Sequence, residues 1–108
     1  MPRIVKGGLI QASNPVAPTA DTSKMSKAEI ARELARVKEA MLSKHEKLTA
    51  AAAKKGVQIL CYQEIFNGPY FCPEHHMRWY LTAEPIPGPT VDEVAKWAKK
   101  FAMAIVVP

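Results

Sequence analysis

The sequence predicts an α/β protein with a parallel sheet, in the order strand, helix, strand, short helix, helix, strand. Two long segments carry apolar residues at helical spacing, and short runs of apolar and β-branched residues precede and follow them. Strands that alternate with helices form βαβ units, in which the strands are parallel and the crossover is right-handed. The 108 residues suffice for one small domain with its own core.

The first expected strand spans residues 3–11 and contains a Gly7-Gly8 pair, which indicates a bulge or the close approach of another backbone. Residues 13–23 are rich in Pro, Ala, Thr and Ser and are expected to form a loop.

A long first helix is expected next, because Ser26 and Glu29 form a capping box, Ser-x-x-Glu. One apolar stripe follows, at spacings typical of a helix face: Ile30, Leu34, Val37, Met41 and Leu48. His45 lies near this stripe, where a lone histidine is more often a packed or boundary residue than a ligand. Gly56 is placed to end the helix in a left-handed conformation.

The central strand begins at Val57 and leads to a single carboxylate, Glu64, before the chain breaks at Asn67-Gly68-Pro69. In α/β sheets, ligands and catalytic groups gather just past the carboxyl ends of the strands. Glu64 lies at that position, and a partly buried carboxylate there suits a general base. The alternative is an ordinary solvated glutamate at a strand end.

After this loop, residues 74–83 are expected to form a short helix, and residues 84–89 are too rich in proline for a central strand. Thr90 and Glu93 form a second Ser/Thr-x-x-Glu capping box. Its helix carries an apolar stripe of Val94, Trp97, Ala98 and Phe101. A third strand starts at Ala104. Because the sequence ends within this apolar strand, we expect residues 1–108 to be the N-terminal portion of a single larger α/β domain, incomplete at its C-terminus. The alternative is a domain that must pair with another chain.

Composition argues against several other classes of protein. The net charge of +5 comes largely from one helix on which Lys and Arg alternate with Glu, so we expect no nucleic-acid partner. No apolar run has the length of a membrane span, and the N-terminus lacks a secretory cleavage pattern. Cys61 and Cys72 are too few for a disulfide framework, and Cys61 is expected to be buried in its strand. A cytoplasmic protein with reduced thiols is the simplest interpretation.

Two alternative sites involve Cys72. Together with His75 and His76 it offers metal ligands, but structural zinc sites usually have two well-spaced ligand pairs, so no metal site is predicted. A Cys72–His75 nucleophile pair would need a base within reach and a third group that orients it. Most aromatic residues of this region should pack in the core, whereas Tyr70 lies in the break itself and is best placed to present its hydroxyl to a pocket.

The stretch VQILCYQEIFNGPYFCPE, followed by AEPIPGPT and by a helix leading to AIVVP, resembles the nitrilase superfamily of carbon–nitrogen hydrolases. Within it, the stretch is most similar to the N-carbamoyl amidohydrolase branch, which includes β-ureidopropionases (β-alanine synthases) and N-carbamoylputrescine amidases. The resemblance covers nearly all of this chain, but only about the first third of such an enzyme. It implies a four-layer α-β-β-α sandwich that forms dimers or larger assemblies.

The resemblance also implies a chemistry that uses Glu, Lys and Cys in that order along the chain, without a cofactor. Glu64 matches the general base, and Tyr70 matches a residue of the substrate pocket, to which we add Phe66. The family's Lys and nucleophilic Cys lie beyond the third strand, so neither Cys61 nor Cys72 is that nucleophile. Residues 1–108 alone are therefore expected to be inactive.

The implied reaction is hydrolysis of a linear non-peptide C–N bond. The expected substrate is a small N-carbamoyl (ureido) acid such as N-carbamoyl-β-alanine, an intermediate of pyrimidine breakdown, which would give an amine, ammonia and carbon dioxide. An aliphatic amidase or a nitrilase of the same superfamily is the first alternative. A small α/β interaction module without catalysis is the second.

Overall fold

A three-stranded parallel sheet is the centre of the structure, a computed structural model that describes residues 3–16 and 21–108. The strands are β1 (Gly7–Ile10), β2 (Ile59–Tyr62) and β3 (Ala104–Val106), and β2 lies between the other two. Gly7 pairs with Ile59, which pairs in turn with Ala104, and both neighbours run parallel to β2. The predicted βαβ arrangement and the parallel sheet are confirmed, although β1 is shorter than the predicted residues 3–11.

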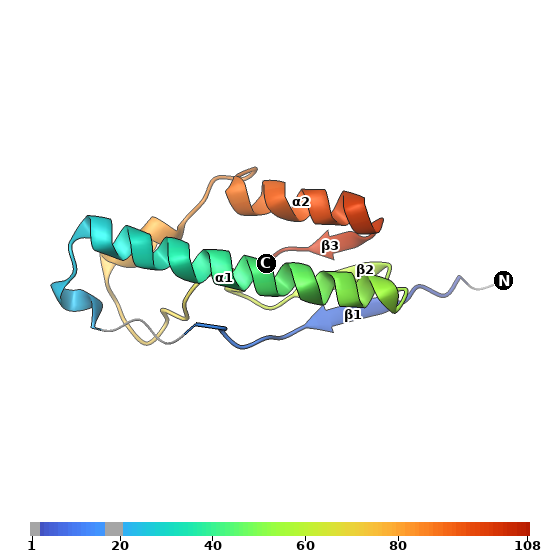
Figure 1. Cartoon of the computed structure of the whole chain (residues 1–108), viewed down its shortest axis with the longest axis horizontal. Helices are drawn as coiled ribbons and strands as arrows, with labels where there is room; N and C mark the ends of the chain where they lie inside the picture. The colour runs from blue at the N-terminus through green and yellow to red at the C-terminus, as the bar shows by residue number, and fades with distance from the viewer. Residues whose placement is uncertain (1–2, 17–20) are drawn as a thin grey trace.

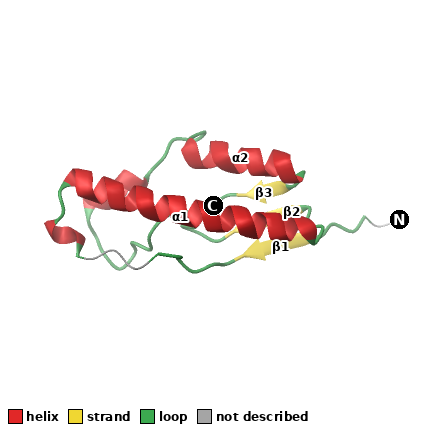
Figure 2. Cartoon of the chain, viewed as in Figure 1, coloured by secondary structure: helices red, strands yellow, loops and turns green. Residues whose placement is uncertain are grey.

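Helices α1 (Lys27–Lys54) and α2 (Pro89–Phe101) lie on the same face of this sheet (Figure 1). Two crossovers of the same hand that step across a sheet in one direction place both helices on one face. Leu60 and Tyr62 of β2 point to this face and are buried against Val94 and Trp97 of α2. Figure 2 shows that α1 extends well beyond the sheet, over the loops that follow β2.

The other face of the sheet is open and apolar. Because side chains alternate along a strand, Leu9, Ile59 and Val106 all point away from the helices, and they are 86%, 43% and 46% exposed. Cys61 lies on this face and is half-buried, so the prediction that it is buried was wrong. Parallel sheets are normally covered on both faces. The described residues supply only one of the two layers.

The capping box of α1 is confirmed: Glu29 N–H donates to Ser26 Oγ over 3.2 Å, and Ser26 N–H donates to Glu29 Oε2 over 2.7 Å. Gly56 has φ +77°, as expected for the residue that ends the helix. The buried stripe differs from the predicted one, since Leu34 and Leu48 are only half-buried. The buried residues of α1 are Ile30, Val37, Met41, His45 and Thr49. From Val37 onward they recur every four residues, which slowly rotates the buried face around this helix of 28 residues.

The second predicted capping box is wrong. Helix α2 begins at Pro89 with Gly88 as its N-cap, so Thr90 already lies in the first turn. The Thr90 N–H donates instead to Glu84 Oε2, from the preceding loop, over 2.8 Å. A carboxylate at a helix N-terminus satisfies an unpaired N–H and interacts favourably with the helix dipole. Glu84, six positions before Thr90, therefore takes the capping role that was predicted for Glu93.

The short helix predicted for residues 74–83 is a 3₁₀-helix, η2, which covers only Met77–Thr82. His76 caps it, since Arg78 N–H donates to His76 Nδ1 over 3.0 Å. A second 3₁₀-turn, η1 (Thr22–Lys24), lies in the predicted loop of residues 13–23, of which residues 17–20 fall outside the described part of the chain.

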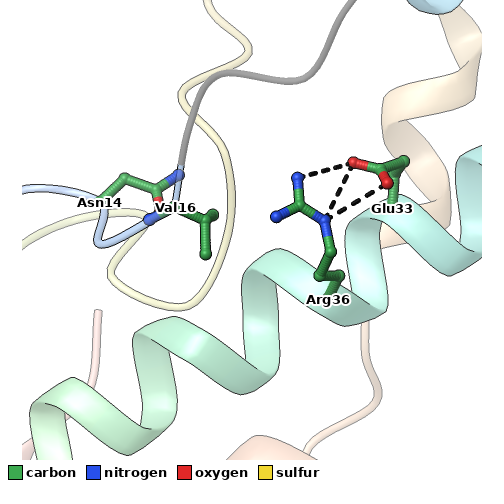
Figure 3. Close-up of polar contacts among 4 residues, drawn as sticks. All are labelled: Asn14, Val16, Glu33 and Arg36. Carbon is green, nitrogen blue, oxygen red and sulfur yellow. Dashed lines mark hydrogen bonds and ion pairs between the residues drawn. The ribbon is translucent and has the colours of Figure 1, made fainter.

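Glu33 and Arg36 of α1 form an ion pair (Figure 3). Its N–O distance is 2.9 Å, and the two side chains are partly exposed to solvent, so the pair contributes little to stability. Arg36 points toward the loop in which Asn14 Oδ1 accepts from Val16 N–H over 3.1 Å. Among the described residues, no helix has both the length and the apolar composition needed to cross a membrane.

Candidate active site

Glu64 follows the central strand by two residues, at the carboxyl end of the sheet. Gln63, the residue between Tyr62 of β2 and Glu64, ties this end of β2 to the segment that follows β1. Its Nε2 donates to the carbonyl oxygen of Ala12 over 2.9 Å, and its Oε1 accepts from the N–H of the same residue. The ends of the two strands are therefore held together directly before Glu64, which lies past the central strand as the sequence predicts. Its side chain is exposed, so the expectation of a partly buried carboxylate is wrong.

The backbone turns sharply after Glu64. Ile65 has φ +53°, in the left-handed region that β-branched residues rarely adopt. Phe66 then points inward and is 1% exposed, and its ring centroid lies 4.8 Å from that of Tyr62 and 5.0 Å from that of His45. The turn thus places Glu64 at the surface and Phe66 beneath it.

The residues under Phe66 form a neutral polar cluster. The Nδ1–H of His45 donates to the Met41 carbonyl oxygen over 2.8 Å, because a carbonyl can only accept. Burial lowers the pKa of His45 and raises that of Tyr62, so both side chains are held in their uncharged forms. Thr49 Oγ1 donates to the His45 carbonyl over 2.7 Å, which leaves it to accept from the Tyr62 hydroxyl over 2.7 Å.

A cleft of about 600 Å³ opens beside the turn, and Glu64 lies in its wall. Helix α1 contributes mostly small or apolar residues to this cleft, namely Ala31, Leu34, Ala35 and Lys38. The opposite wall is formed by the turn, with Ile65, Asn67, Gly68 and Pro69, and by Leu81, Thr82 and Glu84 from η2 and the loop after it. This volume suits a small organic molecule.

A hydrogen-bond chain crosses the wall of the cleft. Lys38 Nζ forms an ion pair with Glu84 Oε1, and Thr90 Oγ1 donates to the same oxygen over 2.8 Å. Thr90 Oγ1 also accepts from Asn67 Nδ2 over 3.0 Å. Partial burial lowers the pKa of the Lys38 ammonium.

Comparison with known proteins identifies the family of this chain. The sequence profile of the carbon–nitrogen hydrolases matches residues 25–108, which include Glu64 and every residue of the hydrogen-bond chain.

The chain belongs to the carbon–nitrogen hydrolase family.

Its relatives confirm the resemblance to the N-carbamoyl amidohydrolase branch of the nitrilase superfamily. A β-ureidopropionase of Arabidopsis thaliana is 33% identical over 107 residues, which are 99% of this chain and 23% of that relative. An N-carbamoylputrescine amidase of Solanum lycopersicum is 38% identical over 63 residues, 57% of this chain and 21% of the relative. An enzyme of the same name from Oryza sativa subsp. japonica gives the same identity and coverage. The chain thus spans less than a quarter of these relatives' lengths. No solved structure is significantly similar to it.

The structure of this carbon–nitrogen hydrolase chain brings only one of the three predicted site residues into the cleft wall. Glu64 lines it, whereas Phe66 is buried beneath the turn and Tyr70 is 74% exposed and outside the lining. Cys72 is exposed. Within residues 3–16 and 21–108, no three His, Cys, Asp or Glu side chains are grouped to hold a metal ion.

The sequence did not predict the group formed by Lys38, Glu84, Thr90 and Asn67. One signal was present, because a glutamate directly before a proline-rich loop and a helix start is a natural partner for the unpaired N–H groups of that helix. Nothing in the local sequence connects Lys38 to that loop, since the two partners are 46 residues apart.

Proposed function

We propose that the whole protein containing this chain hydrolyses a linear non-peptide C–N bond, with Glu64 as its general base. The observation that supports this most directly is the position of Glu64, at the carboxyl end of the central strand and in the wall of a cleft. A carboxylate held at the rim of a cleft can accept a proton from a nucleophile and return it to a leaving group.

The proposed substrate is an N-carbamoyl acid such as N-carbamoyl-β-alanine. The relatives named as a β-ureidopropionase and as N-carbamoylputrescine amidases support this choice. One molecule of water and one of the ureido acid would yield the amine, ammonia and carbon dioxide. By family resemblance, a cysteine thiolate would attack the carbamoyl carbon and a lysine would stabilise the developing oxyanion. In this scheme Glu64 removes the thiol proton and passes it to the departing ammonia, which leaves a covalent thioester-type intermediate. Water, deprotonated by Glu64, then breaks the C–S bond, and the carbamate released splits into the amine and carbon dioxide.

We further propose that the open face of the sheet is the inner face of a four-layer α-β-β-α sandwich. Leu9, Ile59 and Val106 expose apolar side chains there, as expected for a surface that another sheet covers. The same resemblance favours a cytoplasmic enzyme that assembles into dimers or larger oligomers, which light scattering of the purified protein and cell fractionation would test.

The decisive experiment measures ammonia release by the protein translated from the complete reading frame, with N-carbamoyl-β-alanine, N-carbamoylputrescine, an aliphatic amide and a nitrile as substrates. The Glu64→Gln variant should lose about 10²-fold to 10⁴-fold or more in kcat, because it cannot accept a proton. Glu39→Gln is the matched control, since Glu39 is an exposed carboxylate of α1 outside this cleft. Normal turnover by Glu64→Gln would remove Glu64 from the mechanism, and preference for an amide or a nitrile would overturn the substrate assignment.

A further inference from the structure

We propose that Asn67, Thr90 and Glu84 are positioning residues for Glu64, and that their hydrogen-bond chain sets the orientation of the turn that carries this carboxylate. This inference rests on the proposed role of Glu64 as general base. It adds three residues that do not react themselves and that act through the backbone of residues 64–67.

The turn needs such support because its own backbone is strained. Ile65 has φ +53°, and a non-glycine residue persists there only when its surroundings hold it. Burial of Phe66 is one anchor, on the carboxyl side of Ile65. Apolar burial is non-directional, so it fixes the depth of the turn better than its orientation. The Asn67 side chain supplies the directional contact, through its hydrogen bond of 3.0 Å to Thr90 Oγ1.

The direction of every bond in the chain follows from chemistry. An ionised carboxylate can only accept, so the single hydroxyl proton of Thr90 is committed to Glu84 Oε1 over 2.8 Å. Thr90 Oγ1 can then only accept from Asn67, which requires the amide nitrogen, rather than the amide oxygen, to face it. Glu84 therefore determines the orientation of the Asn67 side chain through the threonine hydroxyl.

The far end of the chain is fixed to both helices. Glu84 Oε2 accepts from the Thr90 N–H in the first turn of α2 over 2.8 Å, and Glu84 Oε1 pairs with Lys38 of α1. Thr90 is 4% exposed, and the side chains of Lys38 and Glu84 are 29% and 18% exposed. Hydrogen bonds to a charged group in a partly buried setting are stronger than neutral or exposed ones. The hydrogen-bond chain therefore fixes the position of the turn relative to both α1 and α2.

The test compares Thr90→Val with Thr90→Ser in the active enzyme. Valine keeps the shape of threonine but removes the hydroxyl, whereas serine keeps the hydroxyl. We expect Thr90→Val to lower kcat by about 10-fold to 100-fold with KM nearly unchanged, since a small displacement of a catalytic group costs that much. Thr90→Ser should retain most of the activity. Asn67→Ala removes only the Asn67–Thr90 bond and leaves the cap of α2 intact, so it should reproduce the loss of kcat if Thr90→Val does not fold.

The Glu64→Gln variant distinguishes a positioning role of Thr90 from a merely structural one, when Thr90→Val is added to it. If Thr90 acts through the Glu64 carboxylate, Thr90→Val should leave the residual rate of Glu64→Gln unchanged. An equal fold-loss in both backgrounds, or wild-type kcat in both Thr90→Val and Asn67→Ala, would overturn the inference while leaving Glu64 as the base. Full activity of Glu64→Gln by itself would instead overturn the proposed function.

Discussion

Replacing Phe66 tests whether the turn that carries Glu64 is anchored from below. Phe66→Leu keeps an apolar side chain at this site but removes the ring, and Phe66→Ala also leaves a cavity. The ring is 1% exposed and contacts the rings of Tyr62 and His45, with centroids 4.8 and 5.0 Å away.

The magnitude follows from these contacts. Each aromatic pair is worth about 0.5–1.5 kcal/mol beyond its buried area, so Phe66→Leu should lower the free energy of unfolding by about 1–3 kcal/mol. Phe66→Ala should cost about 3–5 kcal/mol, because the lost burial and the cavity add to the lost ring contacts.

The assay is urea-induced unfolding of the whole protein, followed by circular dichroism and analysed by linear extrapolation. Tyr70→Leu is the matched control, because Tyr70 belongs to the same loop but is 74% exposed and should change stability by less than about 0.5 kcal/mol. If Phe66→Leu were no more destabilising than Tyr70→Leu, the ring would not anchor the turn, and burial of Phe66 could not be what holds Ile65 in its left-handed conformation.

Two further predictions concern stability. Burial lowers the pKa of His45 below the ordinary 6.5, so the unfolded chain binds this proton first as the pH falls. The contribution of His45 to the free energy of unfolding should therefore be constant above about pH 6.5. At lower pH it should decrease, by up to about 1.4 kcal/mol for each pH unit. Urea titrations between pH 5 and 8 should show this decrease in the wild-type protein, and His45→Leu should abolish it. Ala102 ends α2 with φ +50° and Gly56 follows α1 with φ +77°. In the same urea titrations, Ala102→Gly should raise the free energy of unfolding and Gly56→Ala should lower it, each by about 1 kcal/mol. The same sign for both would contradict this.

Much of the fold could be predicted because its signals are local. The capping box at Ser26, the apolar periodicity of the two helices and the glycine at residue 56 each depend on residues within a few positions of one another. The same holds for Glu64, since an apolar run that ends in a carboxylate and Asn-Gly-Pro places that carboxylate past a strand. Alternation of strands and helices then implied the parallel order that the structure has.

The predictions that failed involved contacts between distant residues. Thr90 was expected to be capped by its near neighbour Glu93, but Glu84 fills that role because the proline-rich loop folds back over the start of α2. His45 and Thr49 are buried more deeply than Leu34 and Leu48. The sheet and Phe66 contact α1 along a face that differs from the one its apolar residues predict. The Nδ1 of the histidine and the hydroxyl of the threonine bond to carbonyls of α1, and the threonine also meets the hydroxyl of Tyr62, which no local pattern could supply.

The sequence by itself determined the order of the elements, the parallel pairing and the position of Glu64 past the central strand, because each depends on short-range periodicity and turn chemistry. Only the tertiary structure decided which side chains hold that carboxylate in place. Lys38 and Glu84 are 46 residues apart, and Asn67 and Thr90 are 23 apart. Such pairs meet only where the packing of two helices on one sheet face brings their segments together.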